Sequence, residues 1–317
     1  MLKILLLFVL CIQLNAKDLV KLHINKNHIF LTFVESISGV RYVSKVPKRI
    51  YLSKYKNDIK NFVKLHKKIS RSSIKKYPHT RSLLEAFYFE SIKHENFSDF
   101  ENSIKSYKVG IGKKDLNKYF SYLHKLYPRF EKIIWNKTYK SLLYKKSKLK
   151  KLMKSKHFET KLHKVLKFYG VKKSDIGVMD IAFYPISYGN NINAYSIGNI
   201  ESIGMFVGRS QDLTWLLSAT ILHELSHSIY RKSKFVQRNF ANLKDKKRKR
   251  TINEVLATAI GAGWGYHSFT NKYPVRLWYN NKIYDKFGKL VYPKVKYYID
   301  NDKVIDKEFG HYIKGLL

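Results

Sequence analysis

The sequence predicts an α+β protein, in which a mainly helical N-terminal half precedes a region with a small antiparallel sheet and further helices. Two observations support this class. Residues 51–168 place apolar side chains at steps of three and four, which is typical of amphipathic helices. Residues 171–207 instead hold apolar runs separated by glycine and asparagine, which is typical of strands joined by turns. A chain of 317 residues is long enough for one large domain or two smaller ones.

The first sixteen residues, "MLKILLLFVLCIQLNA", resemble a secretory signal peptide. Lys3 precedes an apolar run over residues 4–12, and the small Ala16 offers a cleavage site, so we expect a secreted or periplasmic protein. The run is shorter than the roughly 20 apolar residues that span a bilayer, and we expect no transmembrane helix after cleavage. The alternatives are a core strand or a membrane anchor.

Cys11 is the only cysteine and lies inside this apolar run. A lipoprotein anchored through Cys11 is the less favoured interpretation, because the bulky Leu10 stands where lipoprotein signals have a small residue. Cleavage after Ala16 would leave no cysteine, which excludes disulfides, thiolate metal sites and a cysteine nucleophile.

The chain is strongly basic, with 62 Lys and Arg against 23 Asp and Glu. Lysine-rich runs include "KKSKLKKLMKSKHFETKLHK" at residues 145–164 and "KDKKRKR" at residues 244–250. Such a surface attracts anionic partners, with an anionic envelope polymer preferred over nucleic acid. The alternative is a solvated basic surface without a specific partner.

The elements before Gly170 are expected to be one strand-like segment and a series of helices. Residues 19–42 alternate in places as strands do, and residues 51–168 follow a helical period that Pro128 breaks or kinks. His66 and His163 lie in basic helices and are expected at the surface. The change of character near Gly170 suggests three regions: a signal peptide at 1–16, a basic helical region at 17–170 and a second region at 171–317.

After Gly170 the pattern predicts strands and then helices. "VMDIAFYPISYG" predicts a strand, and "INAYSIGNIESIGMFVG" predicts a strand pair around Gly198 and Asn199. A helix capped by Ser210 follows and runs to Tyr230. A basic loop then leads to a second helix that opens at Thr251, and the last 45 or so residues predict a short strand pair and a terminal helix.

The stretch "ILHELSHSIY" carries the strongest functional motif, H-E-x-x-H, formed by His223, Glu224 and His227. Histidines four apart share one face of a helix, so both can bind one zinc ion at about 2.0–2.1 Å. Glu224 is then placed to take a proton from a zinc-bound water that attacks a carbonyl. The alternative is a pair of structural histidines, which would need hydrogen-bond partners in this apolar stretch.

A catalytic zinc needs a third protein ligand. Six residues after His227 stands Ser233, so a third histidine at that spacing is absent. Asp245 lies inside a run of basic residues and is a poor candidate. Glu254, in "NEVLATA", remains.

With Glu254 following His223, Glu224 and His227 in an N-E-x-x-A context, residues 180–269 resemble the gluzincin metallopeptidases. The resemblance implies a zincin-like catalytic region in which a zinc-binding helix and a glutamate-bearing helix hold Zn²⁺ through His223, His227 and Glu254. It also implies that the strand pair before the zinc helix binds an extended peptide or protein substrate. The interval between His227 and Glu254 is longer than in thermolysin-type members, and the helical half matches no family.

Glu254 has a second interpretation, because "TINE" is also a capping box in which Glu254 would bond the Thr251 amide. Small residues downstream favour close packing of this helix on another, as zinc binding by Glu254 requires. They are Ala257, Ala259, Gly261 and Gly263.

A further donor usually stabilises the oxyanion in such peptidases. The candidates are Tyr266, His267, Tyr297, Tyr298 and His311. Asn193 and Ala194 are candidates for backbone pairing with substrate.

Three functions follow from these patterns. The first is an exported zinc peptidase with Glu224 as general base. The second is a non-catalytic basic binding protein for anionic envelope polymers or nucleic acid, with a structural or inactive zinc site. The third is zinc-dependent hydrolysis of a non-peptide amide, such as a cell-wall linkage.

Overall fold

The computed structural model describes residues 19–39, 56–186, 194–197, 200–207, 214–240, 243–273 and 281–317. The expected signal peptide, Cys11, Asn193 and the expected cap Ser210 lie outside these residues. Within them the fold is mostly helical with one small sheet, in agreement with the α+β class. No helix among them combines the length and the apolar character needed to cross a membrane.

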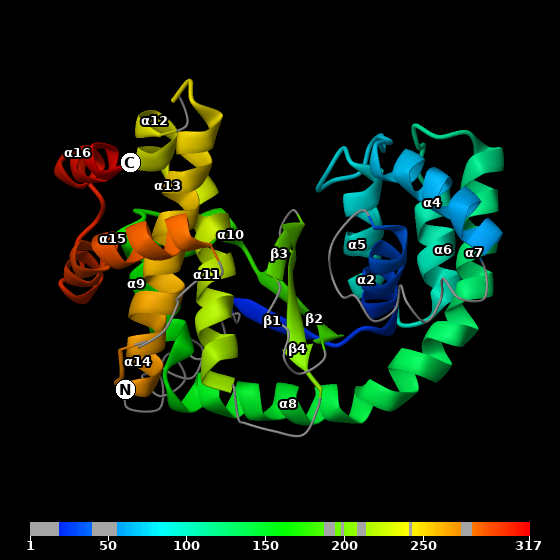
Figure 1. The fold of residues 1–317 in the computed structure, drawn as a ribbon, viewed down its shortest axis with the longest axis horizontal. Helices are drawn as coiled ribbons and strands as arrows, with labels where there is room; N and C mark the ends of the chain where they lie inside the picture. The colour runs from blue at the N-terminus through cyan, green and yellow to red at the C-terminus, as the bar shows by residue number, and fades with distance from the viewer. Residues whose placement is uncertain are drawn as a thin grey trace, which may run out of the picture.

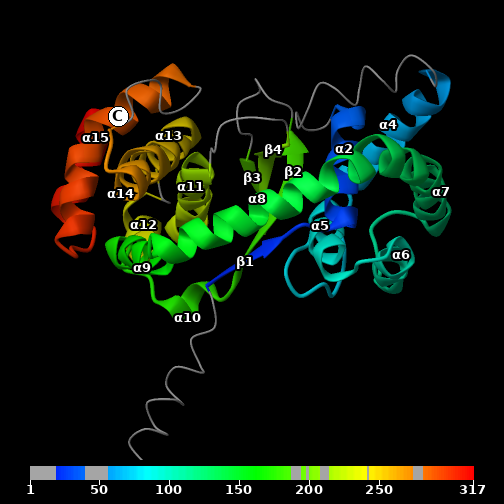
Figure 2. The same ribbon diagram turned by 90° about the horizontal axis from the view of Figure 1, so that it is seen from below.

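The N-terminal half is built from helices that gather at one end of the molecule, with α8 running from them beneath the sheet to the other end (Figure 1). The helices at that end are α2 (Lys26–Ser38), α4 (Lys56–Ser70), α5 (Leu83–Lys93), α6 (Phe97–Ser106) and α7 (Lys113–Phe130). α8 (Asn136–Ser155) leads to α9 (Phe158–Phe168) and the short α10 (Lys173–Ile176), which lie at the other end beside the C-terminal helices (Figures 1 and 2). The chain stays helical through Pro128, passing from α7 into the π-helical segment η1 (Glu131–Trp135) and on into α8, where it bends (Figure 1).

The expectation of strand structure over residues 19–42 is wrong for most of the described part of that segment. Only β1 (Val20–His23) is a strand, and Asn25 then caps α2, its side chain accepting hydrogen bonds from the amides of Asn27 and His28. Every residue of α2 after its first is buried. A helix that is buried on all sides has no polar face, so its sequence lacks the amphipathic period that reveals most helices.

The sheet has the strand order β1-β2-β4-β3. The other strands are β2 (Met179–Ile186), β3 (Ala194–Ile197) and β4 (Ile200–Phe206). β3 and β4 pair antiparallel, as the expected strand pair requires, but β1–β2 and β2–β4 are parallel. The sheet is therefore mixed, and the expectation of an antiparallel sheet is wrong.

Two parallel strands that are neighbours in a sheet need a long connection between them. Between β1 and β2 this connection is the whole series of helices from α2 to α10. The sheet thus joins strands from both sides of Gly170.

The C-terminal half packs helices against the sheet and against one another (Figures 1 and 2). They are α11 (Thr214–Lys232), α12 (Lys234–Asn239), α13 (Lys246–Thr258), the π-helical segment η2 (Ala259–Gly265), α14 (Tyr266–Thr270), α15 (Lys282–Asp300) and α16 (Lys307–Leu316). Two expectations are corrected. The basic loop after α11 contains α12 and the start of α13. Residues 281–317 hold α15 where a strand pair was expected, whereas the expected terminal helix is present as α16.

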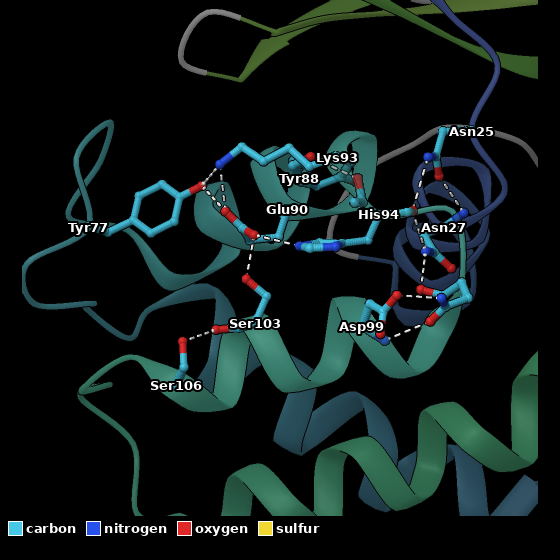
Figure 3. Close-up of polar contacts among 12 residues, drawn as sticks. Asn25, Asn27, Tyr77, Tyr88, Glu90, Lys93, His94, Asp99, Ser103 and Ser106 are labelled. Carbon is cyan, nitrogen blue, oxygen red and sulfur yellow. Dashed lines mark hydrogen bonds and ion pairs between the residues drawn. The ribbon is translucent and has the colours of Figure 1, made fainter.

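Buried polar clusters stabilise the helical half. Figure 3 shows Glu90 of α5 accepting hydrogen bonds from Tyr77, Lys93 and Ser103 and contacting His94. Burial alone would raise the pKa of Glu90, but these hydrogen bonds lower it to about 2. The carboxylate therefore stays charged and ties α5 to α6.

A second cluster corrects the prediction for His66. His163 is exposed as expected, but His66 is buried. Its Nδ1 lies 2.7 Å from the Tyr119 hydroxyl and its Nε2 lies 3.1 Å from Glu35 Oε1. α4 turns this histidine towards α2 and α7, so its role is to connect these three helices.

Asn25→Ala is expected to destabilise the protein by about 1–2 kcal/mol, because the first turn of α2 loses its cap. Urea unfolding measures the change. Asn117→Ala is the matched control, since Asn117 is exposed within α7. Equal stability of the two variants would contradict the capping role.

Candidate metal centre

α11 presents two rows of polar side chains to two different neighbours. His223 and His227 face the helical segment formed by α13 and η2, and both are buried. Glu224, Ser228 and Arg231 follow one another at steps of four and three residues, on the side of α11 that contacts β3 and β4. α11 thus has a histidine face, formed by His223 and His227, and a carboxylate face, on which Glu224 lies in line with Ser228 and Arg231.

The histidine face meets Glu254, as the sequence predicts. The Nε2 atoms of His223 and His227 lie 3.2 Å apart. Glu254 Oε2 lies 3.9 Å from His223 Nε2 and 3.7 Å from His227 Nε2. The point equidistant from these three atoms lies about 2.1 Å from each, which is the length of a Zn–N or Zn–O bond in proteins.

The tautomer of His227 also suits a metal. Its Nδ1 lies 3.0 Å from Asn253 Oδ1, and an amide oxygen only accepts hydrogen bonds. Nδ1 therefore carries the proton, and Nε2 directs a lone pair at the shared point. The ring of His223 is hydrogen-bonded to the backbone of Ala257.

Burial keeps both imidazoles neutral. It lowers the pKa of His223, as does the neighbouring His227, against the opposing effect of the hydrogen bond that the ring donates to the backbone of Ala257. Burial also lowers the pKa of His227, against the opposing effect of Glu254. Neutral imidazole is the form that binds metal.

One helix carries both the third candidate ligand and the groups that orient the two histidines. Asn253, Glu254 and Ala257 are all on α13. α13 begins at Lys246, where the Asp245 side chain accepts hydrogen bonds from the amides of Lys247 and Arg248. The capping-box interpretation of Glu254 is therefore wrong. Thr251 lies inside the helix, and its hydroxyl donates to the carbonyl of Lys247.

The two helices approach each other at Gly261 of η2. A Cβ atom on Gly261 would lie 2.5 Å from His223 Cβ and 2.8 Å from the carbonyl oxygen of Ala219. No side chain fits there without separating the helices. The close packing expected of the small residues after Glu254 is thus confirmed at Gly261.

Glu224 lies beside this centre, its Oε1 3.9 Å from His223 Nε2. Burial raises the pKa of Glu224 well above its usual value, and the nearby Glu201 and Glu254 add to the effect. A raised pKa means that this carboxyl holds a proton more readily than an exposed glutamate does.

Glu201 of β4 is a buried member of the site region that the sequence analysis missed. It is fully buried and accepts hydrogen bonds of 2.5 Å from Ser196 of β3 and Ser228 of α11. Arg231 in turn donates to the Ser228 hydroxyl. Glu201 therefore ties the edge strand β3 to α11. A glutamate inside the apolar "NIESIGMF" was the available signal in the sequence.

The candidate oxyanion donors have other partners in the structure. Tyr298 donates to Asp306, the half-exposed Tyr297 contacts Lys303, and His311 is exposed. On α14, Tyr266 packs on Trp215 and His267 packs on Tyr273. The geometry selects none of these five. Tyr184 of β2, which was not a candidate, is buried within electrostatic range of Glu224.

No known protein family, curated protein or solved structure matches this chain.

Gly261→Ala is expected to destabilise the protein by about 1–3 kcal/mol, because the added methyl group meets backbone atoms of α11. Thermal and urea unfolding measure the change. Gly315→Ala is the matched control, since a Cβ there meets nothing within 4 Å and alanine favours helix. If Gly261→Ala were as stable as Gly315→Ala, the close packing would be refuted.

Glu201→Gln is expected to raise stability, increasingly so as the pH rises above about 4.5. Burial raises the pKa of Glu201, so the folded state favours its protonated form. The stability that protonated Glu201 contributes is complete below its pKa in the unfolded chain and is lost as the pH rises through its pKa in the folded protein. The total loss is about 1.4 kcal/mol for each pH unit that separates these two pKa values. Unfolding free energies from pH 4 to 8 test this. Parallel pH profiles of wild type and variant would disprove it.

Proposed function

We propose that the protein is an exported zinc peptidase of the gluzincin type, with zinc held by His223, His227 and Glu254. One observation carries the proposal. Three donor atoms from two helices surround a single point at zinc-binding distance, in a buried site where Asn253 fixes the tautomer of His227.

Zinc bound there would lower the pKa of a water molecule and polarise the carbonyl under attack. Glu224 acts as the general base that accepts the proton of the attacking water and then returns it to the leaving amine. Its position next to His223, outside the ligand triangle, suits that role. Zinc binding alone does not require Glu224, which favours a catalytic over a purely structural site.

The substrate of this site is a peptide or protein segment in extended form. β3 is the last strand of the described sheet, pairing with β4 on one side, and it contacts α11. A segment that hydrogen-bonds along β3 would extend the sheet and pass beside the carboxylate face of α11. The Ser196–Glu201–Ser228 hydrogen bonds hold β3 at a fixed distance from that helix.

Zinc analysis of the purified protein tests the proposal. We expect one zinc ion per chain in the wild type. We expect Glu254→Ala to lose it, because a catalytic zinc site needs three protein ligands and this variant would supply only two histidines. Glu308→Ala is the matched control, since Glu308 is exposed and distant in sequence. Equal zinc content in all three proteins would exclude Glu254 as a ligand.

Glu224→Gln separates catalysis from metal binding. The variant is expected to keep its zinc and to lose about 10²–10⁴-fold in peptide hydrolysis, the usual contribution of a general base. Undiminished hydrolysis would eliminate the mechanism. Zinc without hydrolysis of any peptide by the wild type would favour the non-catalytic binding protein or a non-peptide amide substrate.

A further inference from the structure

α8 (Asn136–Ser155) has an unusual composition for a long surface helix. It holds eight lysines and no acidic side chain. No carboxylate on the helix itself can therefore neutralise any of its lysines through the (i, i+4) pairs that surface helices commonly use. A helix of this kind is a concentrated positive charge on a rigid support.

The packing of α8 divides it into an inner and an outer face. Leu142 and Leu149 are buried on the inner face, which packs against α11 and β2. Figure 2, seen from below, shows the length of α8 crossing in front of the sheet. The outer face carries most of the lysines, and those with exposed side chains are Lys137, Lys140, Lys148, Lys150, Lys151 and Lys154.

The outer face also exposes large apolar side chains among these lysines. Tyr139, Leu143 and Tyr144 are 36%, 40% and 60% exposed, and they lie within six residues of one another. The ammonium group of Lys148 lies 5.0 Å from the centre of the Tyr144 ring. A face that combines exposed leucine and tyrosine with lysines is complementary to a partner that is both anionic and apolar.

We propose that the outer face of α8 binds the surface of a bilayer rich in anionic phospholipids. Lysine clusters on a helix bind acidic head groups, and Leu143 and Tyr144 can enter the boundary between head groups and acyl chains. A nucleic acid would satisfy the lysines but would leave Leu143 without an apolar environment. The inference does not depend on the proposed peptidase activity.

The arrangement also predicts how the protein lies on the membrane. α8 contacts α11 and crosses it near one end of α11 (Figure 1), so a protein bound through the outer face of α8 has α11 and the candidate metal centre on the side of α8 away from the bilayer. Because these lysines are exposed, their attraction for lipid falls with ionic strength, over a screening length of about 8 Å at physiological salt.

Vesicle co-sedimentation with the full chain tests the proposal. One set of vesicles contains phosphatidylglycerol and phosphatidylcholine, and the other contains phosphatidylcholine alone. The α8 variant changes Lys140, Lys148, Lys151 and Lys154 to Gln. The matched control removes the same charge elsewhere, by changing the exposed Lys60, Lys64, Lys67 and Lys75 to Gln. Circular dichroism verifies that both variants are folded.

We expect the wild type to bind only the anionic vesicles, the α8 variant to lose binding about tenfold or more, and the control to change about twofold or less. Leu143→Gln with Tyr144→Gln is expected to weaken vesicle binding at unchanged charge, while binding to a DNA duplex stays the same. Equal losses in the two lysine variants would overturn the proposal, because net charge alone would explain them. Loss of DNA binding with intact vesicle binding in the α8 variant would also overturn it.

Discussion

The candidate centre depends on the close approach of two helices at a point where one of them has no side chain. Gly261 lets η2 rest directly on the backbone of α11 at His223. That contact brings α13 near enough for Asn253 and Ala257 to orient the histidines and for Glu254 to complete the triangle. The candidate ligands and the groups that orient the two histidines therefore all lie on helices.

The site differs electrostatically from the rest of the molecule. The chain carries 62 basic residues against 23 acidic ones, yet Glu201, Glu224 and Glu254 gather around α11. Burial raises the pKa of Glu201 and Glu224, which lessens the repulsion among the three carboxyl groups. A divalent cation beside them would lessen it further. The hydrogen bonds of Glu201 to β3 and α11 show that such a buried carboxyl can also have a purely architectural role.

The sequence predicts which residues come together at the candidate site better than it predicts the fold around them. The spacing of His223 and His227 implies a shared helix face, and the structure brings Glu254 to that face. The position of Glu201 could not be predicted, because it depends on which strands pair. The same limit explains the mixed sheet, since β1 and β2 are neighbours in space but are separated by the entire helical half. α2 was not predicted for a different reason, because complete burial removes the periodic pattern of a surface helix. The first turn of α13 was predicted to be a loop because a run of lysine and arginine resembles one, although both residues favour helix.

The pairing of Val20 with Met179 has a consequence for how the protein folds. As the chain leaves the ribosome, β1 is among the first described segments to appear, but its partner strand follows only after the helices α2 to α10 have been synthesised. A contact of such long range forms late, since closing the intervening loop costs entropy before any pairing is gained. The helices can collapse first and bring the two strands together. Until β1 pairs with it, β2 has an unpaired edge, and such an edge is exposed to pairing with another chain.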